Sequence, residues 1–283
     1  MGELIDIEPL KENLLIDIKE KILKINKRKK IVFLIFSESF DAKIYLNELR
    51  ELFDTLKLKY LEHNLKNKNL KYILETLQKL SIDDEVNGIL PIRPFPKNID
   101  EQIIYSNIEP KKDIDCLSFT NLGKLFSFKP EFIPTVVEAS FEILKYYVKR
   151  KFKNLDYLTG KVAVIVGRSI NTGRPLYILS LMNNLVPINL HSKVKNIEKF
   201  LKLGDIIFAC CGVPEFIKGE MVKENSIIID IGINKSISNE IVGDVDTKSV
   251  LDKVMGVTKV PHGVGEITKL ILVKNFLKTF NFI

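Results

Sequence analysis

A polar turn with two glycines follows an apolar segment, and its residue types point most directly to chemistry. Residues 164–177 read VIVGRSINTGRPLY, in which Gly167 and Gly173 bracket the turn and Arg168 and Ser169 offer hydrogen-bond donors to an anion. A strand, a glycine turn and a helix in this order form the phosphate-binding corner of dinucleotide sites. The glycine spacing is G-x-x-x-x-x-G rather than G-x-G-x-x-G, so the pattern alone also fits a plain strand-to-helix corner.

The end of the next expected strand bears on the choice of cofactor. Residues 186–190 read VPINL and are followed by His191, Ser192 and Lys193. NAD sites usually carry an acidic residue here, which accepts hydrogen bonds from the ribose, whereas a hydroxyl and a cation suit a 2′-phosphate. These residues favour NADP, although a lysine at a strand end is also ordinary surface and NAD stays possible.

The hydrophobic pattern supplies the framework that positions these residues. In the first part, helices and strands alternate, with helices expected at 8–26, 42–56 and 69–80 and strands at 29–36, 58–65 and 86–94. A loop-like stretch at 121–132 and a long helix at 136–152 lead into a second series. Its strands are expected at 161–166, 186–190, 205–211, 226–232 and 254–258, before a last helix at 267–280. This alternation predicts an α/β protein of two domains with mainly parallel sheets.

Composition excludes several classes of protein. The chain has 283 residues, 46% of them apolar, and a net charge of +7 from scattered lysines. No basic stretch alternates with aromatic residues, so we expect no nucleic-acid partner. There is no signal-peptide core and no apolar run of about 18 residues, so we expect a cytoplasmic protein without a membrane segment. The three histidines are far apart in sequence, which predicts no metal site.

Several longer motifs together resemble the bifunctional methylenetetrahydrofolate dehydrogenase/cyclohydrolase family. They are VGRSINTGRP, HSK, GDIIFACCGVPEFIKGEMVKENSIIIDIGIN, VGDVD and VPHGVGEIT in the second half, and NGILPIRPFPKNID and KDIDCLSFTNLGKL in the first. The resemblance covers nearly the whole chain and implies two domains. One is an N-terminal αβα folate domain (residues 1–125 with a returning helix at 265–283), and the other is a C-terminal Rossmann-like dinucleotide-binding domain (residues 126–264). By analogy, a homodimer is also implied.

The resemblance assigns residues to both ligands. Those at the cofactor would be Gly167, Arg168 and Ser169 at the phosphates, with Gly173 opening the helix behind them, Ser192 and Lys193 at the adenosine end, and Ile233 beside the nicotinamide. Those at the folate would be Tyr45, which orients it, Asp115, which anchors the polar edge of the pterin, and Pro261, Gly263, Val264 and Gly265, which wall the site. Judged without the family, Asp113 and Asp115 also fit a turn cap, and Tyr45 fits an ordinary helix face.

Several positions depart from the family pattern, namely Cys116 in place of a glycine, His262 in place of a small residue, Glu266 in place of a proline, and two that bear on catalysis. The family carries a catalytic Lys four residues after the Tyr, where this chain has Leu49, and a Gln before a Leu-Pro pair, where it has Ile92. Hydration of a methenyl cation needs water activated by a positioned base, and neither side chain can move a proton. Hydride transfer depends mainly on holding the donor carbon against the nicotinamide. We therefore expect an NADP-dependent methylenetetrahydrofolate dehydrogenase whose cyclohydrolase activity is weakened or lost.

Two alternative functions remain open from the sequence. A non-catalytic folate- or nucleotide-binding relative fits the missing Lys and Gln but not the intact GRS, TGRP and DIGIN stretches. A dehydrogenase for a different substrate fits the changes at Ile92, Arg93, Cys116 and His262, which reshape the expected pocket. Binding of a folate analogue and of NADP separates them: absence of both contradicts an enzyme, and binding of the cofactor alone favours a different substrate.

Overall fold

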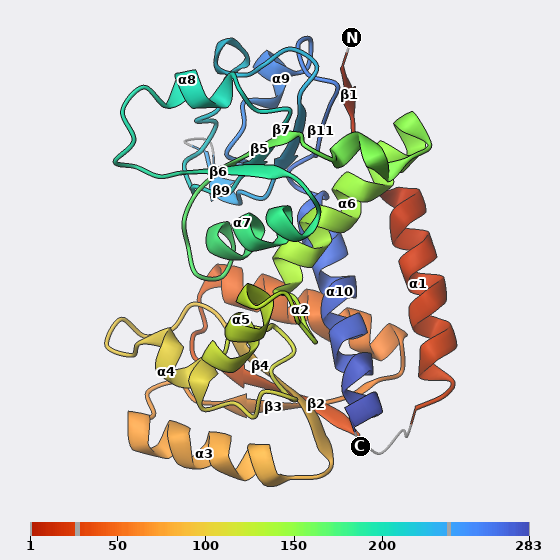
Figure 1. Cartoon of the computed structure of the whole chain (residues 1–283). Helices are drawn as coiled ribbons and strands as arrows, with labels where there is room; N and C mark the ends of the chain where they lie inside the picture. Colours follow the sequence, from red (N-terminus) through yellow and green to blue (C-terminus); the bar gives the residue numbers. More distant parts are fainter. Residues whose placement is uncertain (1, 26–28, 237–238, 283) are drawn as a thin grey trace. The chain divides into compact units, whose positions relative to one another are not determined.

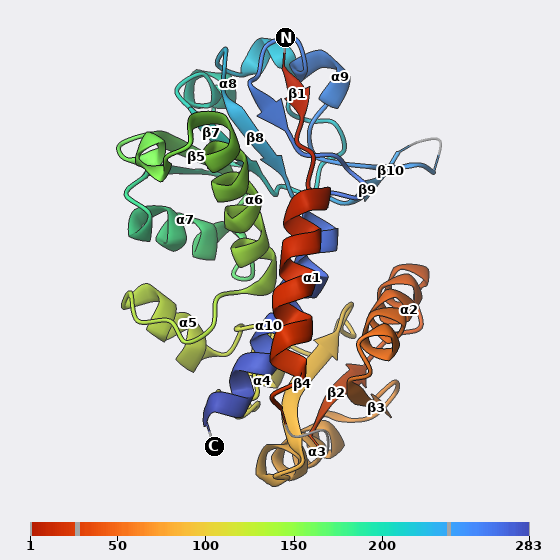
Figure 2. The same cartoon turned by 90° about the vertical axis from the view of Figure 1, so that its right-hand side faces the viewer.

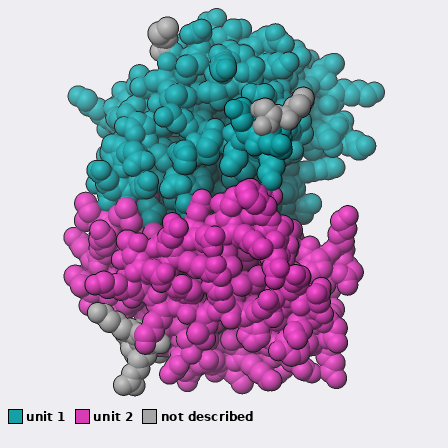
Figure 3. All heavy atoms as spheres, turned by 180° about the vertical axis from the view of Figure 1, so that it is seen from behind, with its two compact units in different colours: residues 1–13, 136–271 teal, residues 14–135, 272–283 magenta. Residues whose placement is uncertain are grey.

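The computed structural model of the chain describes residues 2–25, 29–236 and 239–282 and consists of two compact units. Unit 1 comprises residues 1–13 and 136–271, and unit 2 comprises residues 14–135 and 272–283 (Figure 3). Both contain parallel strands and helices, so the expected α/β class with two domains is confirmed. No helix within the described ranges is long and apolar enough to cross a membrane.

Unit 1 contains a six-stranded sheet in which all neighbouring strands run parallel (Figure 1). In spatial order the strands are β1 (Glu3–Leu4), β11 (Gly256–Val257), β8 (Ile227–Asp230), β7 (Ile206–Ala209), β5 (Val162–Val166) and β6 (Val186–Leu190). Strands β7 and β8 are buried along their whole length, as expected for parallel strands covered on both faces. Residues 1–13, expected with the folate domain, group with unit 1, where β1 pairs with β11.

Neighbouring residues of the central strands pack against different helices of unit 1, because side chains alternate between the faces of a sheet. Ile207 shares an apolar cluster with Val250 of α9 (Thr247–Val250). Phe208 stacks instead on Phe141 of α6 (Thr135–Phe152), with ring centroids 5.2 Å apart. The other elements of this unit include α7 (Gly173–Met182), α8 (Ile197–Leu201), β9 (Asn234–Lys235) and β10 (Ile241–Val242), the last two paired antiparallel.

Unit 2 contains a three-stranded parallel sheet in the order β3-β2-β4 (Figure 2). Its strands are β2 (Lys30–Ile35), β3 (Lys59–Asn64) and β4 (Val86–Ile92), and its helices include α2 (Phe40–Thr55), α3 (Leu70–Ile82), α4 (Glu101–Ser106) and α5 (Phe119–Phe126). Strand β4 is buried throughout, whereas the edge strand β3 is largely exposed. The chain changes unit within α1 (Glu8–Ile22), at the start of α6 and within α10 (Val264–Lys278).

Two expected elements differ from the structure. The stretch 121–132, expected as a loop because of its Gly and Pro, begins inside helix α5, which the Ser118 hydroxyl caps by accepting the amide of Asn121. Strand β7 ends at Ala209, so Cys210 and Cys211, which were expected inside it, lie in the loop that follows. The amide of Cys211 leaves the sheet because it donates to the carboxylate of Asp244.

Candidate active site

The expected phosphate turn lies at the carboxyl end of β5 in unit 1. Gly167 has φ 139°, a backbone conformation that L side chains rarely adopt, and a Cβ there would collide with the carbonyl oxygen of Cys210. A Cβ on Gly173 would likewise collide with the backbone of Gly167. The two glycines therefore let three backbone segments meet at the carboxyl ends of parallel strands, which is where open α/β sheets bind dinucleotides.

This turn offers an anion the donors of its side chains, because the first amides of α7 are already used within the turn. Arg168 and Ser169 are exposed, and Gly173 is buried at the start of α7. The amide of Gly173 donates to Ser169 Oγ at 3.4 Å, and that of Arg174 donates to the carbonyl oxygen of Ser169 at 3.0 Å. Because the turn uses these amides itself, an anion would be held by the Arg168 and Ser169 side chains, with the helix dipole adding a favourable field.

Ser192 and Lys193 lie just after a strand that neighbours β5 in the sheet. They follow β6, which pairs with β5 so that Leu190 lies opposite Val166. The amide of Gly167 donates to the carbonyl oxygen of Leu190 at 3.0 Å, which joins the two strand ends. Both Ser192 and Lys193 are exposed, so a hydroxyl and an ammonium are available where an NAD site usually carries a carboxylate.

The third cofactor candidate follows β8. Ile233 lies in the turn after that strand and has an exposed fraction of 71%, which is unusual for a large apolar side chain. We call the turns after β5, β7 and β8, residues 167–172, 210–213 and 231–234, the cofactor edge of unit 1. An exposed isoleucine at this edge is suited to pack against the flat ring of a bound cofactor.

The motif PHGVG, residues 261–265, forms a tight turn in unit 1 that leads into α10 at Val264. The peptide bond before Pro261 is cis, and His262 has φ 69°, where a small residue was expected. A Cβ on Gly263 would collide with the carbonyl oxygen of Lys259, so the chain turns back on itself here. Of the four expected folate-wall residues, Gly263 and Val264 are buried and Pro261 and Gly265 are exposed.

In unit 2, Tyr45 and Asp115 are brought together although they are 70 positions apart in sequence. Both are half-buried, Tyr45 on α2 and Asp115 after β4. Burial raises the pKa of Tyr45, and the negative charges of Asp115 and Glu48 raise it further. Asp115 accepts a hydrogen bond of 2.5 Å from Thr135 Oγ1. The phenol of Tyr45 therefore stays protonated at ordinary pH and can donate a hydrogen bond but not act as a base.

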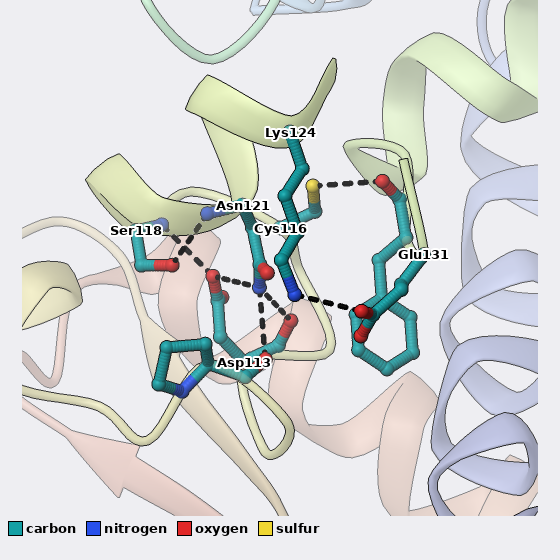
Figure 4. A network of polar contacts seen from close by, with 8 residues as sticks. Asp113, Cys116, Ser118, Asn121, Lys124 and Glu131 are labelled. Atoms are coloured by element: carbon teal, nitrogen blue, oxygen red, sulfur yellow. Dashed lines mark hydrogen bonds and ion pairs between the residues drawn. The ribbon is translucent and has the colours of Figure 1, made fainter. Parts of the chain in front are cut away.

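Asp113 has a different role from Asp115, and Figure 4 shows its carboxylate facing Ser118 and Asn121. It is fully buried and accepts hydrogen bonds from the amides of Leu117 at 3.2 Å and Ser118 at 2.8 Å and from Asn121 Nδ2 at 2.9 Å. Burial raises its pKa, against the opposing effect of these donors. Asp113 thus caps the turn before α5, as one of the two sequence-based interpretations had it, while Asp115 lies half-exposed beside Tyr45.

Leu49 and Ile92 occupy the two positions where the family carries Lys and Gln, and both side chains are completely buried. Leu49 lies one helical turn after Tyr45 on α2, and Ile92 is the last residue of β4. Neither offers a group that could move a proton or hold a water molecule.

A charged pair formed by Arg93, the residue after Ile92, was not recognised from the sequence. Arg93 Nη1 contacts Glu101 Oε2 at 2.8 Å, and the Arg93 guanidinium lies over the ring of Tyr105, 5.6 Å from its centroid. Burial lowers the pKa of Arg93, but Tyr105, Glu101 and Asp115 together raise it above its usual value. Burial also raises the pKa of the Tyr105 phenol, with Asp115 adding to the effect. Apart from an arginine before a proline, the sequence carries no signal for this grouping.

A glycine turn at the carboxyl edge of a parallel sheet, with a hydroxyl and a lysine at the neighbouring strand end, defines a dinucleotide-binding α/β protein. Comparison with known families agrees. Residues 145–282 match the family described as "Tetrahydrofolate dehydrogenase/cyclohydrolase, NAD(P)-binding domain", and residues 5–115 match "Tetrahydrofolate dehydrogenase/cyclohydrolase, catalytic domain". The chain belongs to the tetrahydrofolate dehydrogenase/cyclohydrolase family, as the sequence motifs predicted, and it carries that family's NAD(P)-binding domain.

Individual relatives support this assignment. The bifunctional protein FolD of Dictyoglomus thermophilum is 35% identical over 283 residues, which covers 98% of this chain and 97% of the relative. That of Acetivibrio thermocellus is 34% identical over 270 residues, covering 95% and 92%. The solved structure of FolD methylenetetrahydrofolate dehydrogenase/cyclohydrolase from Campylobacter jejuni is 28% identical, with a TM-score of 0.92 and coverage of 100% of this chain and 99% of that one.

Proposed function

We propose that this protein oxidises 5,10-methylenetetrahydrofolate to 5,10-methenyltetrahydrofolate with NADP, and that its cyclohydrolase activity is weakened or lost. Family membership supports the substrate class. One observation supports a dehydrogenase without full cyclohydrolase activity, and it is a difference between the two units. The cofactor edge of unit 1 has its glycine turn and exposed Arg168 and Ser169, whereas the position of the catalytic lysine in unit 2 is a fully buried Leu49.

In unit 1 the residues bind and orient the cofactor, which accepts a hydride from the methylene carbon of the folate. Arg168 and Ser169 hold its diphosphate, and Ser192 and Lys193 bind the 2′-phosphate that distinguishes NADP from NAD. Ile233 packs against the nicotinamide ring. These contacts require no proton transfer, because the product cation forms when the nitrogen lone pair assists the departure of the hydride.

In unit 2 the residues orient the folate without supplying a base. Asp115 accepts hydrogen bonds from the pterin. The Thr135 hydroxyl donates to the Asp115 carboxylate and holds it in place. Tyr45 contacts the folate as a neutral phenol, because burial and the charge of Asp115 keep its pKa raised. Arg93 is charged at any ordinary pH and is a poor base as well. The lifetime of the methenyl product in the site is therefore expected to be long.

The proposal is tested with the purified protein, methylenetetrahydrofolate and either NADP or NAD, by following reduced cofactor. We expect turnover with a kcat/KM for NADP at least about tenfold above that for NAD. Binding of a folate analogue without any reduced cofactor would support the non-catalytic alternative. Binding of NADP but not of the folate analogue would support a different substrate.

A further inference from the structure

Two buried carboxylates lie behind the cofactor edge and carry no role in the hydride transfer described above. Asp230 is the last residue of β8, and Asp244 lies between β10 and α9; their exposed fractions are 1% and 0%. From the sequence, Asp244 in the motif VGDVD is predicted to be an ordinary turn residue. Its contacts show a different arrangement.

The Asp244 carboxylate joins two of the three turns of the cofactor edge. Its Oδ2 accepts the amides of Cys211 at 2.5 Å and Gly212 at 3.0 Å. Its Oδ1 accepts the amide of Val213 at 3.1 Å and Asn234 Nδ2 at 2.8 Å. A carboxylate has about four lone-pair sites, and these four donors occupy them. Asp244 is therefore saturated by the protein itself and has no site left for a ligand.

Asp230 fixes the backbone that carries Asp244. Its Oδ1 accepts the amides of Gly232 and Asp244, each at 3.0 Å, and its Oδ2 accepts the amide of Val245 at 3.0 Å. The glycine at 232 is required by this arrangement, because a Cβ there would collide with the Asp244 carboxylate. A Cβ on Gly243 would collide with the Asp230 carboxylate in the same way. The two carboxylates and two glycines thus form one tightly fitted assembly.

The segments held by this assembly belong to the surface expected to receive the cofactor. Ile233, which is 71% exposed, lies between Gly232, bound to Asp230, and Asn234, bound to Asp244. The loop from Cys211 to Val213 continues from Cys210, whose carbonyl oxygen lies against Gly167 of the phosphate turn. Loss of the Asp244 carboxylate would remove hydrogen bonds from both segments at once, and no other single group bonds to both of them among the contacts of the described residues.

We propose that Asp244 is a positioning residue for the cofactor. It holds the loop 211–213 and Asn234 in the arrangement that receives the nicotinamide half of the dinucleotide, and Asp230 holds Asp244. This inference rests on the proposed function, because it takes the cofactor to bind at this edge. It differs from the binding roles given above, because Asp244 acts only through residues that it holds.

The test compares Asp244→Asn with Asp205→Asn, a matched carboxylate brace at the opposite end of the sheet. Asp205 accepts the amide of Val162 at 2.9 Å and contacts Lys223 at 2.6 Å, at the start of β5 and away from the cofactor edge. Both variants lose a hydrogen-bonded carboxylate and are expected to lower the stability of unit 1. Only Asp244→Asn is expected to raise the Kd for NADPH and the KM for NADP, by about tenfold or more, with the KM for the folate changed by less than about twofold.

A second readout separates positioning from loss of stability. Hydrogen exchange at the amides of Cys211, Gly212 and Val213 is expected to speed up in Asp244→Asn but not in Asp205→Asn, at a temperature where both are folded. If Asp244→Asn does not fold, Asn234→Ala removes one of the four bonds and is expected to raise the Kd for NADPH by about threefold.

The possible outcomes are distinct for the two proposals. An unaltered protein that binds no NADPH contradicts the proposed function and this inference together. An unaltered protein that binds NADPH, with a Kd that changes no more in Asp244→Asn or Asn234→Ala than in Asp205→Asn, overturns this inference alone and leaves the proposed function intact.

Discussion

Replacing Leu49 by lysine restores the family's catalytic residue at one of the two positions, with Ile92, on which the expected loss of cyclohydrolase activity rests. The Leu49 side chain is completely buried on α2, so the exchange removes a core leucine and places an amine in apolar surroundings. Losing the packing of a buried leucine costs about 2–5 kcal/mol. Burial disfavours the charged ammonium, so the new lysine would have a lowered pKa and would be partly neutral near pH 8. We expect Leu49→Lys to lower the free energy of unfolding by about 3–5 kcal/mol.

The same lowered pKa is what a general base needs, so the destabilised variant should gain activity. We expect Leu49→Lys, alone or with Ile92→Gln, to hydrolyse methenyltetrahydrofolate at least about tenfold faster than the unaltered protein. Urea unfolding gives the stability, and loss of the methenyl absorbance gives the hydrolysis rate. Leu49→Met is the control, since it keeps an apolar side chain of similar volume and should cost less than about 1.5 kcal/mol with no gain in hydrolysis. A stability loss under about 1 kcal/mol in Leu49→Lys would contradict the burial of this position, and hydrolysis no faster than in Leu49→Met would contradict its catalytic role.

Four further predictions concern single side chains. Asp113→Ala leaves the buried amides of Leu117 and Ser118 without their acceptor, whereas Asn121 Nδ2 keeps its bond to the carbonyl oxygen of Pro110. The variant should lower the free energy of unfolding by about 2–5 kcal/mol, measured by urea unfolding; a loss below about 1 kcal/mol contradicts the capping role of Asp113. Lys193→Ala should raise the KM for NADP about tenfold and leave that for NAD unchanged, and an equal effect on both would remove Lys193 from the 2′-phosphate site. Arg93→Leu, which removes the guanidinium beside Asp115, should change the KM for the folate and leave the KM for NADP within about twofold; unchanged folate kinetics would separate Arg93 from the site. Burial raises the pKa of Asp230 from 3.8 to about 7, and the charge of Asp244 adds to this effect. The folded protein therefore binds a proton at Asp230 more tightly than the unfolded chain. The stabilisation from this proton is complete below about pH 4 and is lost as the pH rises through 7. Urea unfolding at pH 5, 6 and 7 should show this slope in the unaltered protein and not in Asp230→Asn.

The regular elements could be predicted from the sequence because their signals are local. The apolar runs that form β2, β5 and β8 lie within a residue or two of their expected bounds, since buried parallel strands require continuous apolar side chains. Helix α5 was missed because it is only eight residues long and carries Gly123 in its middle. Cys210 and Cys211 were expected inside β7 because they are apolar, but the acceptor that draws Cys211 out of the sheet is 33 positions away.

The candidate site shows the same division between local and distant information. The turn from Gly167 to Gly173 was visible in the sequence, because the chain needs glycine wherever backbones approach closely. The separate roles of Asp113 and Asp115 were not, because both precede the same turn and only their acceptor geometry distinguishes them. The assembly around Asp244 was also missed, since its donors come from two other turns of the sheet. Such groupings depend on register between strands, which no local pattern records.

A single time course with two signals distinguishes oxidation of methylenetetrahydrofolate from hydrolysis of its methenyl product. The purified protein is given methylenetetrahydrofolate and NADP, and reduced cofactor and methenyltetrahydrofolate are followed separately, with the uncatalysed hydrolysis of methenyltetrahydrofolate in the same buffer as reference. If the protein is a dehydrogenase without cyclohydrolase activity, both signals rise together and the methenyl product then decays at the buffer rate. Reduced cofactor accompanied by methenyl decay well above the buffer rate would contradict this expectation, because another residue would then be doing the work that Leu49 cannot.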